Sequence, residues 1–130
     1  MNMPALKTDL LPSVNPLFAS IEQAQNQLDG IISATPLALN VNLSDEFQAT
    51  ILLKREDLQV VRSYKIRGAY NKISSLSDAE RQHGIVCASA GNHAQGVAYH
   101  ARRLGIPATI VMPRATPFVK VENTRREPQR

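Results

Sequence analysis

Apolar residues return at helical spacing in several stretches of the chain, and each stretch has the start and stop signals of a helix. Helices are predicted over residues 16–28, 63–73 and 93–104, with a brief capped turn at 77–80 and a last helix that starts at Thr116-Pro117 and ends before Pro128. In the third helix, the residues predicted to face the core are Ala94, Val97, Ala98, Ala101 and Leu104. Gly96 in its interior predicts close packing, since glycine costs a helix about 1 kcal/mol relative to alanine.

Short continuous apolar runs lie between these helices and predict strands at 50–54, 85–88 and 108–112. The run at 50–54 is typical of a strand buried on both faces, and a further extended piece is expected at 39–43. Strands that alternate with helices predict an α/β fold, in which right-handed crossovers join the strands of a parallel sheet. Ligands of such sheets gather at the carboxyl ends of the strands.

Two stretches at strand ends carry candidate chemistry. Lys65 begins a helix, where the positive end of the macrodipole favours the neutral amine that Schiff-base chemistry requires. Residues 89–96 lead from a strand into a helix through small and polar residues, and the unpaired N–H groups there can bind an anion. Asn92 in this loop can cap the helix or donate its side-chain amide to a ligand. The chain therefore offers a nucleophilic amine and an anion site.

Each of these features also has a plain structural interpretation. Most lysines near a helix start are solvated, and small residues are common in tight strand-to-helix turns. His93 is more typical of a surface or packing residue than of a base, and Cys87 is more typical of an inert buried thiol than of a nucleophile. A solvated loop is the preferred interpretation of Glu56 and Asp57. No role and no metal site are assigned to His83 and His100, which have no partners at metal-ligand spacing.

Composition narrows the possible partners. The net charge of +4 comes from dispersed basic residues without interleaved aromatic residues, so nucleic-acid binding is not expected. No apolar run approaches the roughly 20 residues that span a bilayer, and no secretory signal is recognisable. The single cysteine, Cys87, allows no internal disulfide and agrees with a reducing compartment. A soluble, cytoplasmic protein is therefore expected.

Two motifs resemble those of the pyridoxal-phosphate-dependent serine/threonine dehydratases. Residues 63–69 (Ser-Tyr-Lys-Ile-Arg-Gly-Ala), preceded by 53–59, resemble the lysine signature of that family, and 89–96 (Ser-Ala-Gly-Asn-His-Ala-Gln-Gly) resemble its asparagine loop. Thr35-Pro36-Leu37, Met112-Pro113 and Thr116-Pro117 follow in the family's order. The resemblance covers roughly residues 17–124. It implies the N-terminal part of a catalytic domain at 16–124, while the residues themselves predict an N-terminal arm at 1–15 and a divergent polar tail at 125–130.

The resemblance also implies a fold and a role for each site residue. The fold would be an N-terminal helix followed by part of the small domain of a fold-type II, tryptophan-synthase-β-like enzyme. Lys65 would bind pyridoxal 5′-phosphate covalently and take the Cα proton of the substrate, while Asn92 would hydrogen-bond the 3′-hydroxyl of the cofactor. Tyr64 stands where the family commonly has a phenylalanine against the pyridine ring. The substrate carboxylate would be held, largely by backbone N–H groups, at Ser89, Ala90, Gly91 and His93.

Within the family, the chain most resembles the biosynthetic threonine dehydratases, or threonine ammonia-lyases. The implied reaction is β-elimination of threonine to 2-oxobutanoate and ammonia, the entry to isoleucine biosynthesis, in a full-length enzyme that is a homo-oligomer. Serine is a second candidate substrate, and a catabolic or racemase-like dehydratase or a non-catalytic fragment are the alternatives. After Gly105 the sequence has no glycine and thus no counterpart of the family's phosphate-binding loop. The chain is therefore expected to be a fragment that is inactive alone.

Overall fold

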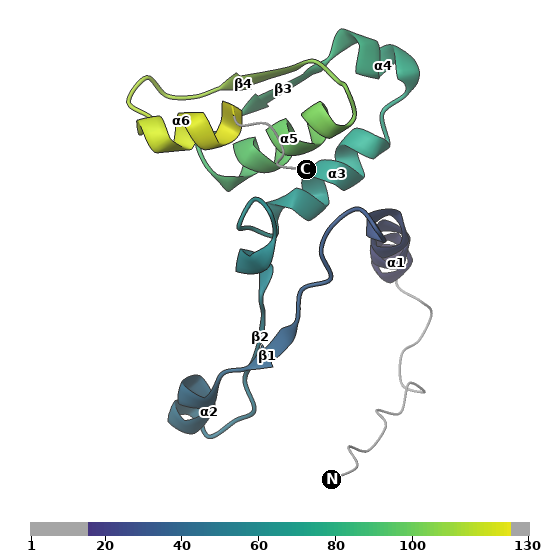
Figure 1. Ribbon diagram of the computed structural model, residues 1–130. Coiled ribbons are helices and arrows are strands. Elements are labelled where there is room, and N and C mark those ends of the chain that lie inside the picture. Colours follow the sequence, from purple (N-terminus) through teal and green to yellow (C-terminus); the bar gives the residue numbers. More distant parts are fainter. Residues whose placement is uncertain (1–15, 126–130) are drawn as a thin grey trace.

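A computed structural model describes residues 16–125, which form a layered body and a long projection (Figure 1). The body holds α3 (Lys65–Ser74), α4 (Asp78–His83), β3 (Ile85–Ala88), α5 (Asn92–Arg103), β4 (Ala108–Val111) and α6 (Phe118–Arg125). The projection, residues 35–55, holds β1 (Leu37–Leu39), α2 (Val41–Phe47) and β2 (Leu52–Lys54). Helix α1 (Pro16–Leu28) contacts α3, and the 3-10 turn η1 (Glu56–Leu58) joins the projection to the body.

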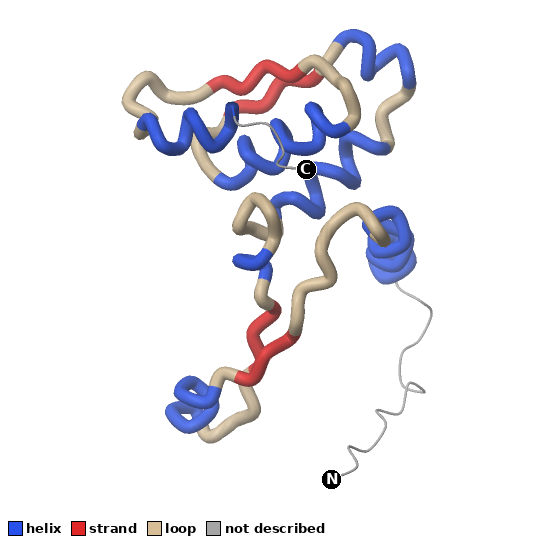
Figure 2. The backbone as a smooth tube through the Cα atoms, in the orientation of Figure 1, coloured by secondary structure: helices blue, strands red, loops and turns tan. Residues whose placement is uncertain are grey.

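The parallel sheet predicted from the alternation of strands and helices is present in the body. Strands β3 and β4 pair in parallel, with Cys87 opposite Ile110, and α5 forms the crossover between them (Figure 2). Helices α3 and α5 cover one face of this sheet. The core between these layers is formed by Ala69, Ile73, Cys87, Val97 and Ile106. This arrangement follows the expected α/β class.

The prediction of a buried strand at 50–54 is wrong. Strand β2 is exposed along its length and pairs antiparallel with β1, in a two-stranded sheet separate from β3 and β4. The continuous apolar run reflects two exposed faces of a ribbon that has a single strand partner among the described residues. Leu52 and Leu53 are consequently 47% and 39% exposed.

The prediction of an extended piece at 39–43 is also wrong, because the strand ends at Leu39 and helix α2 begins at Val41. The side chain of Asn40 accepts a hydrogen bond of 2.9 Å from the backbone N–H of Leu43 and so caps α2. The helix ends at Gln48, which has a left-handed backbone with φ 48°. An asparagine cap directly after a short strand was the signal for this helix.

The predicted inner face of α5 and the predicted capping box are confirmed, whereas Leu17 and Ile21 of the first helix are exposed. In α5 the side chains of Ala94, Val97, Ala98 and Ala101 are buried, and Ser77 and Glu80 form the expected capping box of α4. Leu104 is an exception, because it is the C-cap residue of α5 and remains 38% exposed. The predicted stop at Pro128, the N-terminal arm at 1–15 and all but the first residue of the polar tail lie outside the described residues.

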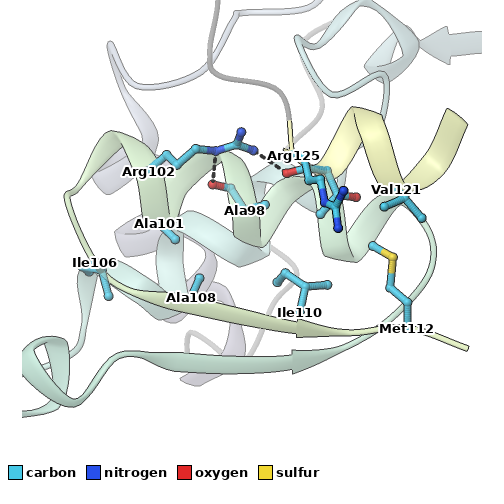
Figure 3. A pocket seen from close by; sticks show the side chains of 10 residues that line it. Ala98, Ala101, Arg102, Ile106, Ala108, Ile110, Met112, Val121 and Arg125 are labelled. Carbon is cyan, nitrogen blue, oxygen red and sulfur yellow. Dashed lines mark hydrogen bonds between the residues drawn. The ribbon is translucent and has the colours of Figure 1, made fainter. Parts of the chain in front are cut away.

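Helix α6 packs against α5 and forms one wall of an open pocket of about 520 Å³ (Figure 3). Arg102 joins the two helices, since its Nε donates to the carbonyl oxygen of Ala98 and its Nη2 donates to that of Thr124. The walls between α5, β4 and α6 are mainly apolar and include Ile106, Ile110, Met112 and Val121. Arg102, at the end of α5, thus holds α6 against this helix rather than only facing solvent.

Gly84, which ends α4, carries a strict backbone requirement. Its φ is +81°, and a Cβ atom built there would lie 2.7 Å from the carbonyl oxygen of Pro107. We expect Gly84→Ala to lower the free energy of unfolding by about 2 kcal/mol or more, because a left-handed backbone and a steric overlap add. Gly30→Ala is the matched control, with φ +66° and nothing within 4 Å. Equal losses in urea unfolding would contradict the steric contribution.

Candidate functional site

Lys65 is the first residue of α3, as the sequence indicated. Ser63 is buried, and its Oγ accepts a hydrogen bond of 3.2 Å from the backbone N–H of Lys65, so the turn before the helix is tied to its first residue. The Lys65 side chain is exposed, and its Nζ lies 5.1 Å from the centre of the Tyr64 ring. An accessible amine is therefore paired with an aromatic face at the start of α3.

The loop at 89–93 continues directly from β3 into α5. The N–H of Ser89 donates to the carbonyl oxygen of Val111, which extends the parallel ladder, and Ser89 Oγ accepts from the N–H of Gly91. Gly91 is the N-cap residue of α5 and makes no side-chain cap. Asn92 begins the helix rather than capping it, so its exposed amide is available to a ligand. A Cβ at Gly91 would meet nothing within 4 Å, which leaves open space beside the backbone.

The two stretches are brought together by the contact between α3 and α5. A Cβ added to Gly96 would lie 3.2 Å from the carbonyl oxygen of Lys65 and 3.3 Å from the N atom of Ile66. The predicted close packing at Gly96 is thus confirmed, and its partner is the backbone of the lysine turn. Asn92 lies one helical turn before Gly96 on α5, on the same side of the helix. The contact joins the backbones, while the Lys65 amine itself rests beside Tyr64.

Glu56 organises the segment that leads to Lys65, contrary to the solvated loop expected for it. Its carboxylate accepts two hydrogen bonds from the Arg67 guanidinium, at 2.7 and 2.8 Å, and one from the Thr35 hydroxyl at 2.5 Å. These bonds, led by those from Arg67, lower the pKa of Glu56 to about 2. Glu56 therefore connects the base of the projection, η1 and α3. Asp57 matches the expectation better, because it is exposed and pairs with Arg55.

His100 is a second residue whose place the sequence did not indicate. It is fully buried on α5, and its Nε2 donates to the carbonyl oxygen of Ile66 over 3.1 Å. Burial, together with the smaller effect of the Arg103 charge, lowers the pKa of His100 to about 4. The ring is therefore neutral near pH 7. Its spacing from Ala94, Val97 and Ala101 on the inner face of α5 was the available signal, since these residues share one helix face.

Cys87 agrees with the expectation of an inert thiol. It is buried in the core beside Ile73 and Val97, and burial raises its pKa. His93 is exposed, which fits a surface position, although it also lines a small cavity beside Gly68 and Val97. Among residues 16–125 no group of three histidine, cysteine, aspartate or glutamate side chains could hold a metal ion. None of the helices in that range is long and apolar enough to cross a membrane.

Comparison with known proteins identifies the family. Residues 28–127 match the family described as "Pyridoxal-phosphate dependent enzyme". The chain belongs to this family. Its cofactor is pyridoxal phosphate, and the residues described above fit that group: an exposed lysine amine, an aromatic neighbour, and a helix start with open space beside Gly91.

Within this family, the chain is similar in sequence to biosynthetic threonine dehydratases. The chain is 53% identical over 105 residues to the biosynthetic L-threonine dehydratase IlvA of Lactococcus lactis subsp. lactis (strain IL1403), and equally to that of Staphylococcus aureus (strain NCTC 8325 / PS 47). The match covers 81% of this chain and 25% of each relative. The chain thus spans about a quarter of the length of these curated relatives.

Solved structures of related enzymes share the fold. Maize serine racemase superimposes with a TM-score of 0.77 at 38% identity, covering 82% of this chain and 32% of the racemase. The processed form of threonine deaminase isoform 2 from Solanum lycopersicum gives 0.71 at 39% identity, covering 89% and 38%. The expected fold class and the expected resemblance are both confirmed.

The Glu56 network predicts a change of stability in acid. Because the pKa of Glu56 is about 2 in the folded protein and about 4.5 when unfolded, its contribution is complete above pH 4.5 and is lost as the pH falls toward 2. We expect Glu56→Gln to lower the free energy of unfolding at pH 7 by ~1–3 kcal/mol and to flatten its decline over this range. Urea unfolding as a function of pH measures both. Asp57→Asn, at an exposed pair, is the control and should change little.

His100 predicts a second decline at higher pH. The unfolded chain takes up a proton near pH 6.5 and the folded protein only near 4, so stability is complete above 6.5 and falls as the pH drops through this range. The loss should reach about 3 kcal/mol, since each pKa unit is worth ~1.4 kcal/mol. His100→Gln should remove this decline while leaving the decline below pH 4.5 in place. An unchanged profile between pH 6.5 and 4 would show that His100 is not buried in its neutral form.

Proposed function

We propose that this chain is the part of a threonine ammonia-lyase that carries pyridoxal phosphate on Lys65 and holds the carboxylate of the substrate. The product would be 2-oxobutanoate with release of ammonia, in the biosynthesis of isoleucine. The observation that carries the proposal is the contact of Gly96 with the backbone of Lys65, because it brings the backbone of the residue that carries the amine within one helical turn of the start of α5. The names of the relatives at 53% identity support threonine as the substrate.

Each residue of the site has a task in this proposal. When bound, the cofactor supplies an electron sink for the charge that develops at the substrate Cα. The Lys65 amine anchors the cofactor and accepts the Cα proton, and the side-chain amide of Asn92 donates to the hydroxyl of the cofactor. Tyr64 offers its ring as an apolar face against which the cofactor ring would pack. Tyr64 is 59% exposed, so this face is accessible.

The substrate carboxylate would lie at the loop that begins α5. The N–H groups at the start of a helix have no intrahelical acceptor, and the helix dipole favours a negative charge there. Residues Ser89, Ala90, Gly91 and His93 line this start. The open space beside Gly91 supports a close approach of the carboxylate to the backbone. The exposed His93 side chain would lie at the rim.

The compartment, the partners and the oligomeric state of the enzyme belong to the same proposal. We infer a soluble, cytoplasmic protein that acts on a free amino acid, does not bind nucleic acid, and is a homo-oligomer in its full-length form. The buried thiol of Cys87 supports a reducing compartment, because it packs in the core without a disulfide partner. The dispersed basic residues of the sequence support the absence of a nucleic-acid surface.

A chimera tests the activity. The 105-residue stretch of the Lactococcus lactis dehydratase that matches this chain would be replaced by the corresponding residues of this chain. We expect the chimera to form 2-oxobutanoate from threonine when pyridoxal phosphate is present, and Lys65→Ala to lower the rate by about 10³-fold. Lys72→Arg, at an exposed lysine on the same helix, is the matched control and should keep the rate.

Cofactor loading distinguishes the outcomes of this experiment. A chimera whose absorbance shows bound cofactor, but which racemises serine or forms no 2-oxobutanoate, would contradict the proposed reaction. In the chain itself, incubation with pyridoxal phosphate, reduction with borohydride and peptide mapping should label Lys65 faster than Lys72. Equal labelling of the two lysines would contradict the assignment of Lys65.

A further inference from the structure

Helix α5 touches the first turn of α3 at two points that lie one helical turn apart. At Gly96 the backbone of Lys65 comes so close that a Cβ atom would lie 3.2 Å from its carbonyl oxygen, which is tighter than an ordinary van der Waals contact. At His100 the ring Nε2 bonds to the carbonyl oxygen of Ile66. The Gly96 contact falls on the peptide group between Lys65 and Ile66, and the His100 contact falls on the carbonyl of the next peptide group. The rotation of the lysine turn about the axis of α3 is therefore set by α5.

The hydrogen bond fixes the tautomer of His100. A carbonyl oxygen only accepts, so Nε2 must carry the hydrogen and Nδ1 must be bare. Nδ1 is buried and has no hydrogen-bond partner among the described residues. The rings of Tyr70 and Tyr99 lie 5.0 and 5.1 Å from the imidazole and restrict its rotation. The Nε2–H group is consequently aimed at one atom, the oxygen of Ile66.

Stability alone does not account for this histidine. Ile66 is the second residue of α3. Inside a helix each carbonyl oxygen accepts a hydrogen bond from the backbone N–H four residues later, so the Ile66 carbonyl does not depend on His100 for a donor. The hydrogen bond from His100 Nε2 is thus additional to the helix bonds. The bare Nδ1 costs free energy, because it loses its hydrogen bond to water on folding and gains no other partner. A phenylalanine would place a somewhat larger aromatic ring between Tyr70 and Tyr99 without a buried nitrogen.

We propose that His100 is a positioning residue: its Nε2–H holds the Ile66 carbonyl and thereby orients the turn that directs the Lys65 side chain toward the cofactor. This inference rests on the proposed function of Lys65. As a positioning residue, His100 would contact neither the cofactor nor the substrate. It acts on the direction of the lysine side chain, through one peptide group.

Two variants separate positioning from packing. His100→Phe fills the space and removes the donor, whereas His100→Gln keeps an amide N–H near the position of Nε2. The readout is the ratio of labelling at Lys65 to labelling at Lys72 with pyridoxal phosphate and borohydride in the purified chain. We expect His100→Phe to lower this ratio about fivefold, which corresponds to ~1 kcal/mol in activation free energy. We expect His100→Gln to restore most of it, and the melting temperature of the Phe variant at pH 8 to stay close to that of the unaltered chain.

The outcomes are distinct. If the unaltered chain labels Lys65 faster than Lys72 and the Phe variant does the same, His100 has no positioning role while the proposed function stands. If the unaltered chain labels the two lysines equally, the proposed function and this inference both fall. A Gln variant that labels as poorly as the Phe variant would also overturn the role of the donor.

A spectroscopic measurement needs no variant. In the ¹⁵N spectrum of the histidine side chains, His100 should show a protonated Nε2, a bare Nδ1 and a coupling from Nε2–H to the Ile66 carbonyl. A spectrum with hydrogen on Nδ1 would overturn the inference, even if both variants failed to fold.

Discussion

The close approach of α3 and α5 at Gly96 is the constraint on which the arrangement depends. With 3.2 Å between a built Cβ and the carbonyl oxygen of Lys65, a side chain at this position would require the backbone of the lysine turn to shift by a few tenths of an ångström. The parallel pair of β3 and β4 sets where α5 begins, because α5 is the crossover between them. The sheet therefore positions the loop at residues 89–93, and the glycine contact positions the backbone of Lys65 relative to that loop.

The fold and the site are held by different kinds of interaction. The layers of the body are apolar, with Ala69, Ile73 and Val97 packed against the sheet. The approach to Lys65 is polar: Glu56 holds Arg67 and Thr35, Ser63 binds the first N–H of α3, and His100 holds the Ile66 carbonyl. Apolar packing determines where the helices lie, and directional hydrogen bonds determine how the lysine turn is oriented.

Local patterns were sufficient where the structure is local. The strand at 85–88, the capping box at Ser77 and the helix that starts at Lys65 follow from short stretches of sequence. The exposed ribbon of β1 and β2 was missed, because an apolar run does not reveal whether a second sheet layer covers it. Glu56 and Arg67 lie eleven positions apart, and Ile66 and His100 lie thirty-four apart. Neither pairing has a sequence period, so only the folded chain brings them together.

The shared carboxylate of Glu56 has a mechanical consequence. Thr35 stands at the base of the projection and donates to Oε1 of Glu56, while Arg67 stands on α3 and donates to both oxygens of the same carboxylate. Bending of the projection at its base would stretch the bonds that hold the helix. The Glu56 carboxylate thus ties the base of the projection to α3, so the geometry of the projection at Thr35 and the geometry of α3 at Arg67 depend on each other.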